Sequence, residues 1–251
     1  MKTKSMKQPD LSIVIPALSE ERRIGSALDG LDKYLKFNSS FKNKTVEVLV
    51  VAADTKDKTH EIVTGKQKLY HDLQLLTPGP VVGKGRDVQY GVQRAKGKIV
   101  MFMDADLATP PDHLEEFYKA INDGNDLVIG TRNLHTYRTN KYRNMLSSFG
   151  NKLYRVVGGT DIEDTQCGFK MFSEEAAKIC FSKLTIQGWG FDVEILAIAK
   201  ANDLNVKPIR ISDWEDKPHS TYNEGPLRII RRTVRDFAHI TTYKLRGKYV
   251  N

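Results

Sequence analysis

Two acidic residues one position apart, Asp104 and Asp106, carry the clearest chemical signal in this sequence of 251 residues. They directly follow residues 99–103, five consecutive apolar residues typical of a strand buried on both faces. Carboxylates at the end of such a strand need a cationic partner. Because hard carboxylate oxygens suit Mg²⁺ or Mn²⁺ shared with a diphosphate, the pair predicts a metal site formed by Asp104 and Asp106.

The alternative for this acidic pair is a solvated turn or a helix cap. The following residues, Thr109-Pro110-Pro111-Asp112, stop a strand and start a helix. In open α/β sheets, ligands collect beyond the carboxyl ends of the strands. The position of the pair, between a buried strand and a new helix, therefore favours the metal site.

Strand-like and helix-like segments alternate along the chain. The expected strands are 11–15, 46–51, 73–76, 99–103, 126–130 and 206–211, and the expected helices are about 24–35, 57–69, 86–95, 112–121, 140–157, 174–181 and 193–201. This alternation predicts an α/β fold with a doubly wound, mostly parallel sheet. We expect a single domain at 11–215, preceded by a disordered tail at 1–10 and followed by a basic amphipathic segment at 216–251.

The positive charge is concentrated in the last tenth of the chain. The net charge is +8, and residues 226–251 hold seven Lys or Arg against one Asp. At 100° per residue, a basic strip in this segment lies beside an apolar strip (Arg228, Arg231, Arg232 and Arg235; Leu227, Ile230, Val234, Phe237 and Ala238). This pattern predicts a helix lying on an anionic membrane surface and argues against a nucleic-acid partner. The alternative is that the apolar strip packs on the domain and the arginines are solvated.

Targeting signals are weak in this sequence. The first ten residues lack the apolar centre of a signal peptide, and no run approaches the roughly 18 apolar residues that span a bilayer. The two cysteines, Cys167 and Cys180, have neither metal-site spacing nor a disulfide framework. We therefore expect a cytoplasmic protein, peripheral on the cytoplasmic face of a membrane.

Seven segments in a fixed order resemble the family-2 inverting glycosyltransferases of GT-A fold. They are SIVIPALSEERRI, VLVVAADTKDKT, GKGRDVQYGVQRAKG, MDADLATPPDHL, GTR, DTQCGFKMF and GWGFDVEIL. Within that family they are most similar to the polyprenyl-phosphate hexosyltransferases, and the last two to the dolichyl-phosphate glucosyltransferase branch. The resemblance implies transfer of a hexose, glucose or mannose, from a nucleotide-diphosphate sugar to a dolichyl or undecaprenyl phosphate.

The resemblance also implies roles for individual residues. Asp104 and Asp106 take the metal positions and, with Arg132 and Arg143, the catalytic ones. The donor, UDP-glucose or GDP-mannose, is expected against Pro16, Ala17, Glu20, Asp54, Lys84, Arg86, Asp104 and Ala105. The lipid acceptor and its phosphate are expected against Arg132, Arg143, Ser147, Gln166 and Trp189.

Two departures from the family pattern leave the nucleotide base open. The family usually has two acids after the second strand, whereas this chain has Ala52-Ala53, with Asp54 one position late. Leu18-Ser19 stands where Tyr-Asn is commoner.

Simpler interpretations also stay open for individual residues. Glu20, Arg86 and Arg143 can be solvated charges, Trp189 can be a packing residue, and the phenylalanines of the last two motifs are expected in the core (Phe169, Phe172 and Phe191).

A lipid phosphate is already anionic near neutral pH, so the predicted transfer needs no strong general base. A soluble or glycan hydroxyl acceptor, the alternative, needs one, and the candidates are Asp164, Asp192 and Glu194. A sugar-phosphate nucleotidyltransferase is a further alternative, but it requires a Gly-rich loop after the first strand, where this chain has PALSEERR. A dinucleotide-binding oxidoreductase is disfavoured because Gly83 and Gly85 do not follow the first strand.

Overall fold

The computed structural model describes residues 7–70, 72–132, 157–162, 164–215 and 226–250. Within these ranges, seven strands form one sheet: β1 (Leu11–Pro16), β2 (Val46–Val51), β3 (Leu73–Leu76), β4 (Ile99–Met103), β5 (Leu127–Arg132), β6 (Phe169–Ser173) and β7 (Val206–Ile211). The helices are α1 (Ile24–Phe37), α2 (Thr59–Gln67), α3 (Lys84–Val92), α4 (Leu114–Asn122), α6 (Glu174–Lys183), α7 (Phe191–Ala201) and α8 (Pro226–Leu245), with a short 3₁₀ helix at Pro111–His113 before α4.

The strand order across the sheet is β3-β2-β1-β4-β6-β5-β7. β1, β2, β3 and β4 are mutually parallel, and β5 pairs with β7 in parallel. β6 runs antiparallel to both of its neighbours, β4 and β5. The order reverses between β1 and β4, which creates the crevice at the carboxyl ends of these strands where ligands of doubly wound folds bind.

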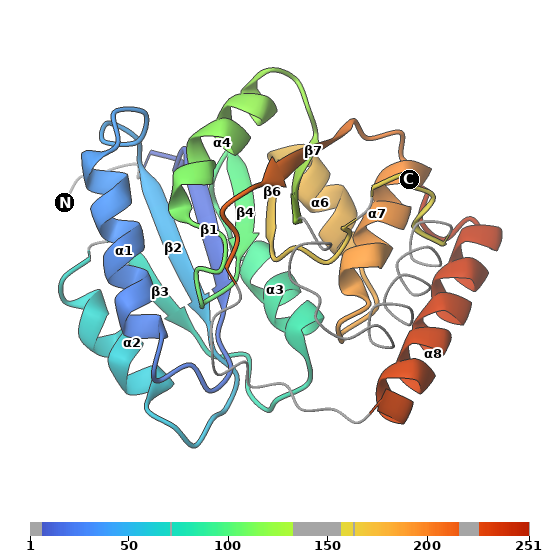
Figure 1. Ribbon diagram of the computed structural model, residues 1–251, viewed down its shortest axis with the longest axis horizontal. Coiled ribbons are helices and arrows are strands. Elements are labelled where there is room, and N and C mark those ends of the chain that lie inside the picture. The colour runs from blue at the N-terminus through green and yellow to red at the C-terminus, as the bar shows by residue number, and fades with distance from the viewer. Residues whose placement is uncertain (1–6, 71, 133–156, 163, 216–225, 251) are drawn as a thin grey trace, which may run out of the picture.

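The period-two side-chain pattern of the central strands builds two cores. In β4, Ile99, Met101 and Met103 face one core, together with buried residues of α1 and α4. Val100 and Phe102 face the other core, which α3, α6 and α7 cover. Figure 1 shows the sheet between these two helical layers. Because both faces are covered, β4 is apolar at every position, as expected for a central strand.

Six of the seven described strands match expected ones, with differences at their ends. β6 was not expected as a strand, because Lys170 interrupts its short apolar run. β5 continues to Arg132, so this arginine lies on the strand and not in a loop. α7 begins at Phe191, two residues early, and α3 begins at Lys84. The helix expected at 140–157 lies almost entirely outside the described residues. Phe169, Phe172 and Phe191 are fully buried, which confirms the prediction that they are core residues.

The two halves of the last helix, α8, differ in how far their apolar side chains are buried against the domain. In its first half Ile230 and Val234 are 46% and 59% exposed, beside exposed arginines. In its second half Phe237 and Ile240 are buried, and the helix packs on α7 (Figure 1). The predicted apolar strip is therefore part core and part surface. Among the described residues, no helix is both long enough and apolar enough to cross a bilayer.

Candidate active site

A pocket of about 210 Å³ opens at the switch between β1 and β4. Its wall comes from the loop after β1, the start of α3, the turn after β4, and Trp189. Pro16 ends β1, and Asp104 follows β4 directly. Segments that are distant in the sequence meet here because parallel strands place their carboxyl ends at one edge of the sheet.

The two carboxylates after β4 meet two cations at this pocket. Lys84 Nζ lies 2.6 Å from Asp104 Oδ1, and Arg23 Nη1 lies 3.8 Å from Asp106 Oδ2. Arg23 is itself held by Glu20, which accepts its Nε and Nη2 hydrogens at 2.7 Å. Burial lowers the pKa of Lys84, but nearby carboxylates, Asp104 foremost, outweigh this and raise it overall. The expected cationic partners of the acidic pair are thus present in the chain itself.

The same carboxylates suit a hard divalent cation. Their side chains are 38% and 26% exposed at the pocket, so both can still reach a ligand. Within the described ranges, no cluster of three or more His, Cys, Asp or Glu is arranged to hold a metal ion. Two protein carboxylates, completed by substrate phosphate oxygens and water, are the coordination that Mg²⁺ commonly adopts. The donor set therefore fits a metal that binds together with a diphosphate.

Gly168 brings β6 into contact with the first carboxylate. The Asp104 N–H donates to the Gly168 carbonyl at 3.0 Å. A Cβ on Gly168 would lie closer than 3.0 Å to the Asp104 carboxylate, a separation that real Cβ atoms essentially never show. The backbone of Cys167-Gly168-Phe169 therefore packs directly against Asp104 and restricts its position.

The start of α3 is braced by the α6–α7 loop, residues 184–190. A Cβ on Gly85 would collide with the carbonyl oxygens of Ile186 and Gly188, so only glycine allows this approach. The Arg86 N–H donates to the Gln187 carbonyl at 3.1 Å. From the same loop, the Trp189 ring lies 5.1 Å from Lys84 Nζ. The loop thus fixes both the position of Lys84 and the aromatic wall beside it.

Arg132, at the end of β5, forms a bidentate ion pair with Asp164. Its Nε and Nη2 lie 2.6 and 3.0 Å from the two carboxylate oxygens, and its N–H donates to Oδ2 at 2.9 Å. The guanidinium also lies 5.1 Å from the Trp214 ring. Burial raises the pKa of Asp164, but the hydrogen bonds and charge of Arg132 outweigh this effect, so the pKa is lowered overall. Asp164 is therefore a fixed counter-ion that orients Arg132.

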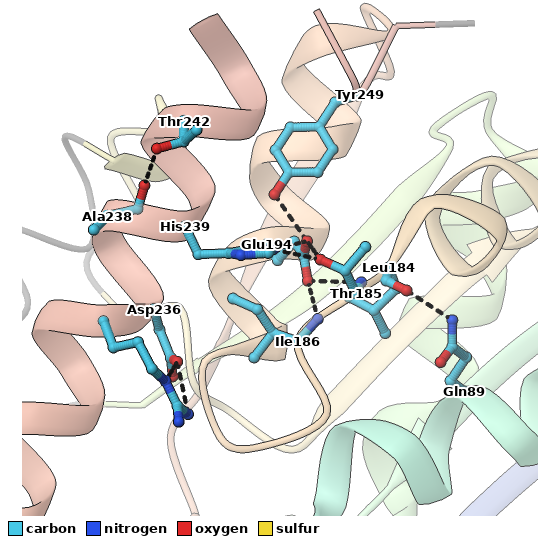
Figure 2. A network of polar contacts seen from close by, with 11 residues as sticks. Gln89, Leu184, Thr185, Ile186, Glu194, Asp236, Ala238, His239, Thr242 and Tyr249 are labelled. Atoms are coloured by element: carbon cyan, nitrogen blue, oxygen red, sulfur yellow. Dashed lines mark hydrogen bonds and ion pairs between the residues drawn. The ribbon is translucent and has the colours of Figure 1, made fainter. Parts of the chain in front are cut away.

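The other two candidate bases are also engaged inside the protein. Asp192 is buried and pairs with Lys170. Glu194, fully buried on α7, accepts hydrogen bonds from the N–H groups of Thr185 and Ile186 at 3.0 and 2.6 Å and from the Tyr249 hydroxyl at 2.8 Å. Figure 2 shows Glu194 between the α6–α7 loop and the C-terminal segment, with His239 of α8 close by. Glu194 therefore ties both segments to α7.

Replacing Glu194 with alanine should lower the free energy of unfolding by about 3 kcal/mol or more, because two buried donors and one partly buried donor lose their acceptor at once. Urea denaturation of the wild type and the variant measures this loss. Glu174→Ala is the matched control, since Glu174 makes an exposed ion pair with Lys178 and should change stability by less than about 1 kcal/mol. Equal stability of the two variants would contradict the role assigned to Glu194.

The pocket brings together six of the eight residues expected at the donor: Pro16, Ala17, Glu20, Lys84, Asp104 and Ala105. Asp106, expected as a metal ligand, and Trp189, expected at the acceptor, also line it. Two expected donor residues do not line it. Asp54 is exposed, and the Arg86 guanidinium binds the carbonyl oxygens of Pro78 and Pro80. Gln166 follows Asp164 and is also absent from the pocket wall. Arg143 and Ser147 lie outside the described residues.

Two charged residues of the pocket were not singled out from the sequence, Arg23 and Asp87. Arg23 lies just before α1 and Asp87 in the first turn of α3, where charged residues are common and usually solvated. Neither position stands out in a linear sequence. Their role is evident only in the fold, which buries Asp87 and partly buries Arg23 at the same pocket.

The model of the family described as "Glycosyl transferase family 2" matches residues 12–181. The chain is 36% identical over 214 residues to a dolichyl-phosphate beta-glucosyltransferase of Trichomonas vaginalis, covering 82% of this chain and 66% of that protein. It is 32% identical to the dolichyl-phosphate beta-glucosyltransferase of Homo sapiens, covering 82% of this chain and 67% of that protein. The chain spans 64% to 66% of the lengths of the three Trichomonas relatives it matches, slightly less than two thirds.

Among solved structures, the fold is similar to glucosyl-3-phosphoglycerate synthase from Mycobacterium tuberculosis in complex with Mn²⁺, UDP-glucose and phosphoglyceric acid. The TM-score is 0.67 at 18% identity, with 97% of this chain and 81% of that chain covered. At this identity the likeness concerns the fold alone. It confirms the predicted fold class, an α/β domain built on a mostly parallel sheet.

Proposed function

Because this chain belongs to glycosyl transferase family 2, we propose that it is a hexosyltransferase that moves glucose from a nucleotide-diphosphate sugar to a polyprenyl phosphate. One observation carries the proposal: Asp104, Asp106, Lys84 and Arg23 converge on a single pocket at the switch point of the sheet. Paired carboxylates beside paired cations are what a metal-bound diphosphate requires.

The proposed donor is UDP-glucose in preference to GDP-mannose. The dolichyl-phosphate relatives are named as glucosyltransferases, and the structural neighbour was solved with UDP-glucose. The diphosphate is assigned to the side of the pocket lined by Lys84 and the two aspartates. When bound there, Mg²⁺ or Mn²⁺ supplies charge stabilisation for the departing nucleoside diphosphate.

The proposed reaction is an in-line displacement. An oxygen of the acceptor phosphate forms a bond to the anomeric carbon, the bond from that carbon to the diphosphate breaks, and the nucleoside diphosphate leaves with the electron pair, inverting the configuration. Lys84 and Arg23 offset the charge of the leaving group. Arg132, oriented by Asp164, is proposed to hold the attacking phosphate together with Arg143 and Ser147.

Two findings favour the phosphate acceptor over a hydroxyl acceptor. The three acids singled out as possible bases, Asp164, Asp192 and Glu194, are each buried and bound to donors or cations. In addition, a second pocket of about 430 Å³ lies between Trp189 and the Arg232, Arg235 and His239 side of α8, and it shares Val82, Gly83 and Trp189 with the donor pocket. An acceptor can therefore approach the donor from α8.

The first half of α8 is proposed to contact anionic lipid headgroups. Arg228, Arg231 and Arg235 are exposed there beside Ile230 and Val234, whereas the second half of the helix is anchored by buried Phe237 and Ile240. A helix that shows cations and apolar side chains on one exposed surface is suited to a membrane interface. This arrangement would bring the pocket to the lipid acceptor.

Purified protein, a panel of nucleotide sugars and polyprenyl phosphate in vesicles test the proposed function. We expect release of UDP and formation of a glucosyl lipid from UDP-glucose, with little product from GDP-mannose and none in excess EDTA. Formation of UDP-glucose and pyrophosphate from UTP and glucose 1-phosphate, in a parallel assay, would instead identify a nucleotidyltransferase. Equal transfer to water-soluble hydroxyl acceptors would overturn the lipid assignment.

Gly168→Ala should reduce the rate of transfer by about 100-fold without unfolding the protein, because the added Cβ displaces the Asp104 carboxylate and a misplacement of about 1 Å at a reacting site costs this much. Initial rates and thermal melting check the two parts. Gly65→Ala is the control, since a Cβ there meets nothing within 4 Å. Full activity of Gly168→Ala would mean that Asp104 does not need its observed position.

A further inference from the structure

Two buried side-chain atoms lack a hydrogen-bond partner in the described part of the chain, and both belong to residues of the donor pocket. They are Arg23 Nη1 and Asp87 Oδ1. Buried polar groups in folded proteins are nearly always paired, so each exception calls for an explanation. Arg23 faces Asp106 at 3.8 Å, which gives it an electrostatic partner. Asp87, only 4% exposed, has no equivalent cation within ion-pair distance among the described residues.

The position of Asp87 is set by the tight packing of α3 on the sheet. Gly91 lies against Val14 of β1 and Val51 of β2, so closely that a Cβ would collide with both. Asp87 precedes Gly91 by four residues and therefore lies on the same side of the helix, one turn closer to the carboxyl ends of these strands. Its neighbours in the pocket wall include Pro16 and Ala17, which follow β1.

Among the carboxylates of this pocket, Asp87 is the one with a buried oxygen that has no hydrogen-bond partner in the described part of the chain. The other acids in the pocket wall are Glu20, held by Arg23, Asp104, held by Lys84, and Asp106, which accepts the Ala108 N–H. After β2, where the family pattern has acids, Ala52 and Ala53 are fully buried and offer no side-chain acceptor. The following Asp54 is exposed and outside the pocket wall.

A purely structural role explains Asp87 poorly. An acid in the first turn of a helix is stabilised by the helix dipole, but it gains this while exposed to water. Here burial raises the pKa of Asp87 to about 6, against the opposing charge of Arg86. The charged carboxylate therefore lowers the stability of the folded protein, as is common for residues that serve binding.

We propose that Asp87 is a specificity determinant for the donor, whose carboxylate accepts a hydrogen bond from an N–H or O–H group of the nucleoside. This inference rests on the proposed function, since it takes the pocket to bind a nucleoside diphosphate sugar. Asp87 supplies from α3 the carboxylate that the Ala52-Ala53 segment lacks after β2. In UDP-glucose, the nucleoside groups that can donate such a hydrogen bond are the imide N–H of the base and the ribose hydroxyls.

Calorimetric titration with UDP tests the proposal. Asp87→Asn should raise the Kd for UDP about 10- to 100-fold, the range for a hydrogen bond to a charged group. The thermal midpoint of the ligand-free variant should stay unchanged or rise, because a buried charge has been removed. Asp123→Asn, at an exposed position after α4, is the control and should change neither quantity.

UDP analogues identify the group that is recognised. N3-methyl-UDP, 2′-deoxy-UDP and 3′-deoxy-UDP each lack one of the hydrogen-bond-donating groups of UDP. The analogue that lacks the partner of Asp87 should bind the wild type as weakly as UDP binds Asp87→Asn, and the variant should not distinguish it from UDP. Wild-type affinity of Asp87→Asn for UDP would overturn the proposal. So would a variant that binds UDP normally but turns over slowly, since that result would make Asp87 catalytic.

Failure of the proposed function and failure of the role of Asp87 give different experimental results. If the wild type itself does not bind UDP, the proposed function is wrong. If the wild type binds UDP and transfers glucose while Asp87→Asn binds equally well, only the role of Asp87 is wrong. A lower thermal midpoint together with unchanged UDP affinity would assign Asp87 to the structure of α3.

Discussion

Asp104→Asn should abolish glucose transfer while the protein stays folded. The substitution keeps the shape of the side chain but removes the charge that faces Lys84 at 2.6 Å and that would bind the metal. Loss of a metal ligand removes several kcal/mol of stabilisation from the leaving diphosphate, which corresponds to a rate reduction of about 1,000-fold or more. Asp106→Asn should have a comparable effect through the same metal.

Initial rates of UDP release with polyprenyl phosphate measure both variants, and circular dichroism checks that each is folded. Asp123→Asn serves again as an exposed control that should retain full activity. Unchanged activity of both pocket variants, or full wild-type activity in excess EDTA, would rule out the metal assignment. The lysine would then be the main counter-charge for the diphosphate, and Lys84→Ala would show the larger loss.

Reversing Arg228 and Arg231 to glutamate should release the protein from anionic vesicles. Both arginines are exposed on the first half of α8 and do not line the second pocket. Each cation near such a surface contributes about 1 kcal/mol, so losing two weakens binding by about 30-fold, and the new negative charges weaken it further. Vesicle flotation measures the release, and high salt should reproduce it with the wild type.

Paired acceptors separate membrane binding from catalysis. The double variant should lose transfer to long-chain polyprenyl phosphate in vesicles and keep transfer to a short, water-soluble analogue. Lys207→Glu with Arg210→Glu, exposed cations of β7, makes the same charge change elsewhere and should still float with vesicles. A wild type that ignores anionic vesicles, or a double variant equally impaired on both acceptors, would make the α8 arginines structural and favour a soluble acceptor.

Six of the seven strands, and the acidic pair after β4, were predictable from residue types along the chain, whereas β6 was not. Residues 99–103 are apolar at every position, a short run typical of a strand covered on both faces. The acids after it were recognisable because the end of a strand and the start of a helix impose local requirements on residue type. Periodicity and turn chemistry act over a few residues, so they can be read along a chain.

Contacts between residues far apart in the sequence are evident only in the folded protein. β6 enters antiparallel between β4 and β5 and sets Gly168 against Asp104, a contact across 64 positions that no periodicity encodes. The same holds for Glu194, which binds Tyr249 of the C-terminal segment, and for Asp164, which neutralises Arg132. Asp87 appears in the sequence as an ordinary first-turn acid. The packing of α3 on β1 and β2 buries it at the pocket, because the cost of an unpaired carboxylate depends on its surroundings and not on its neighbours in the chain.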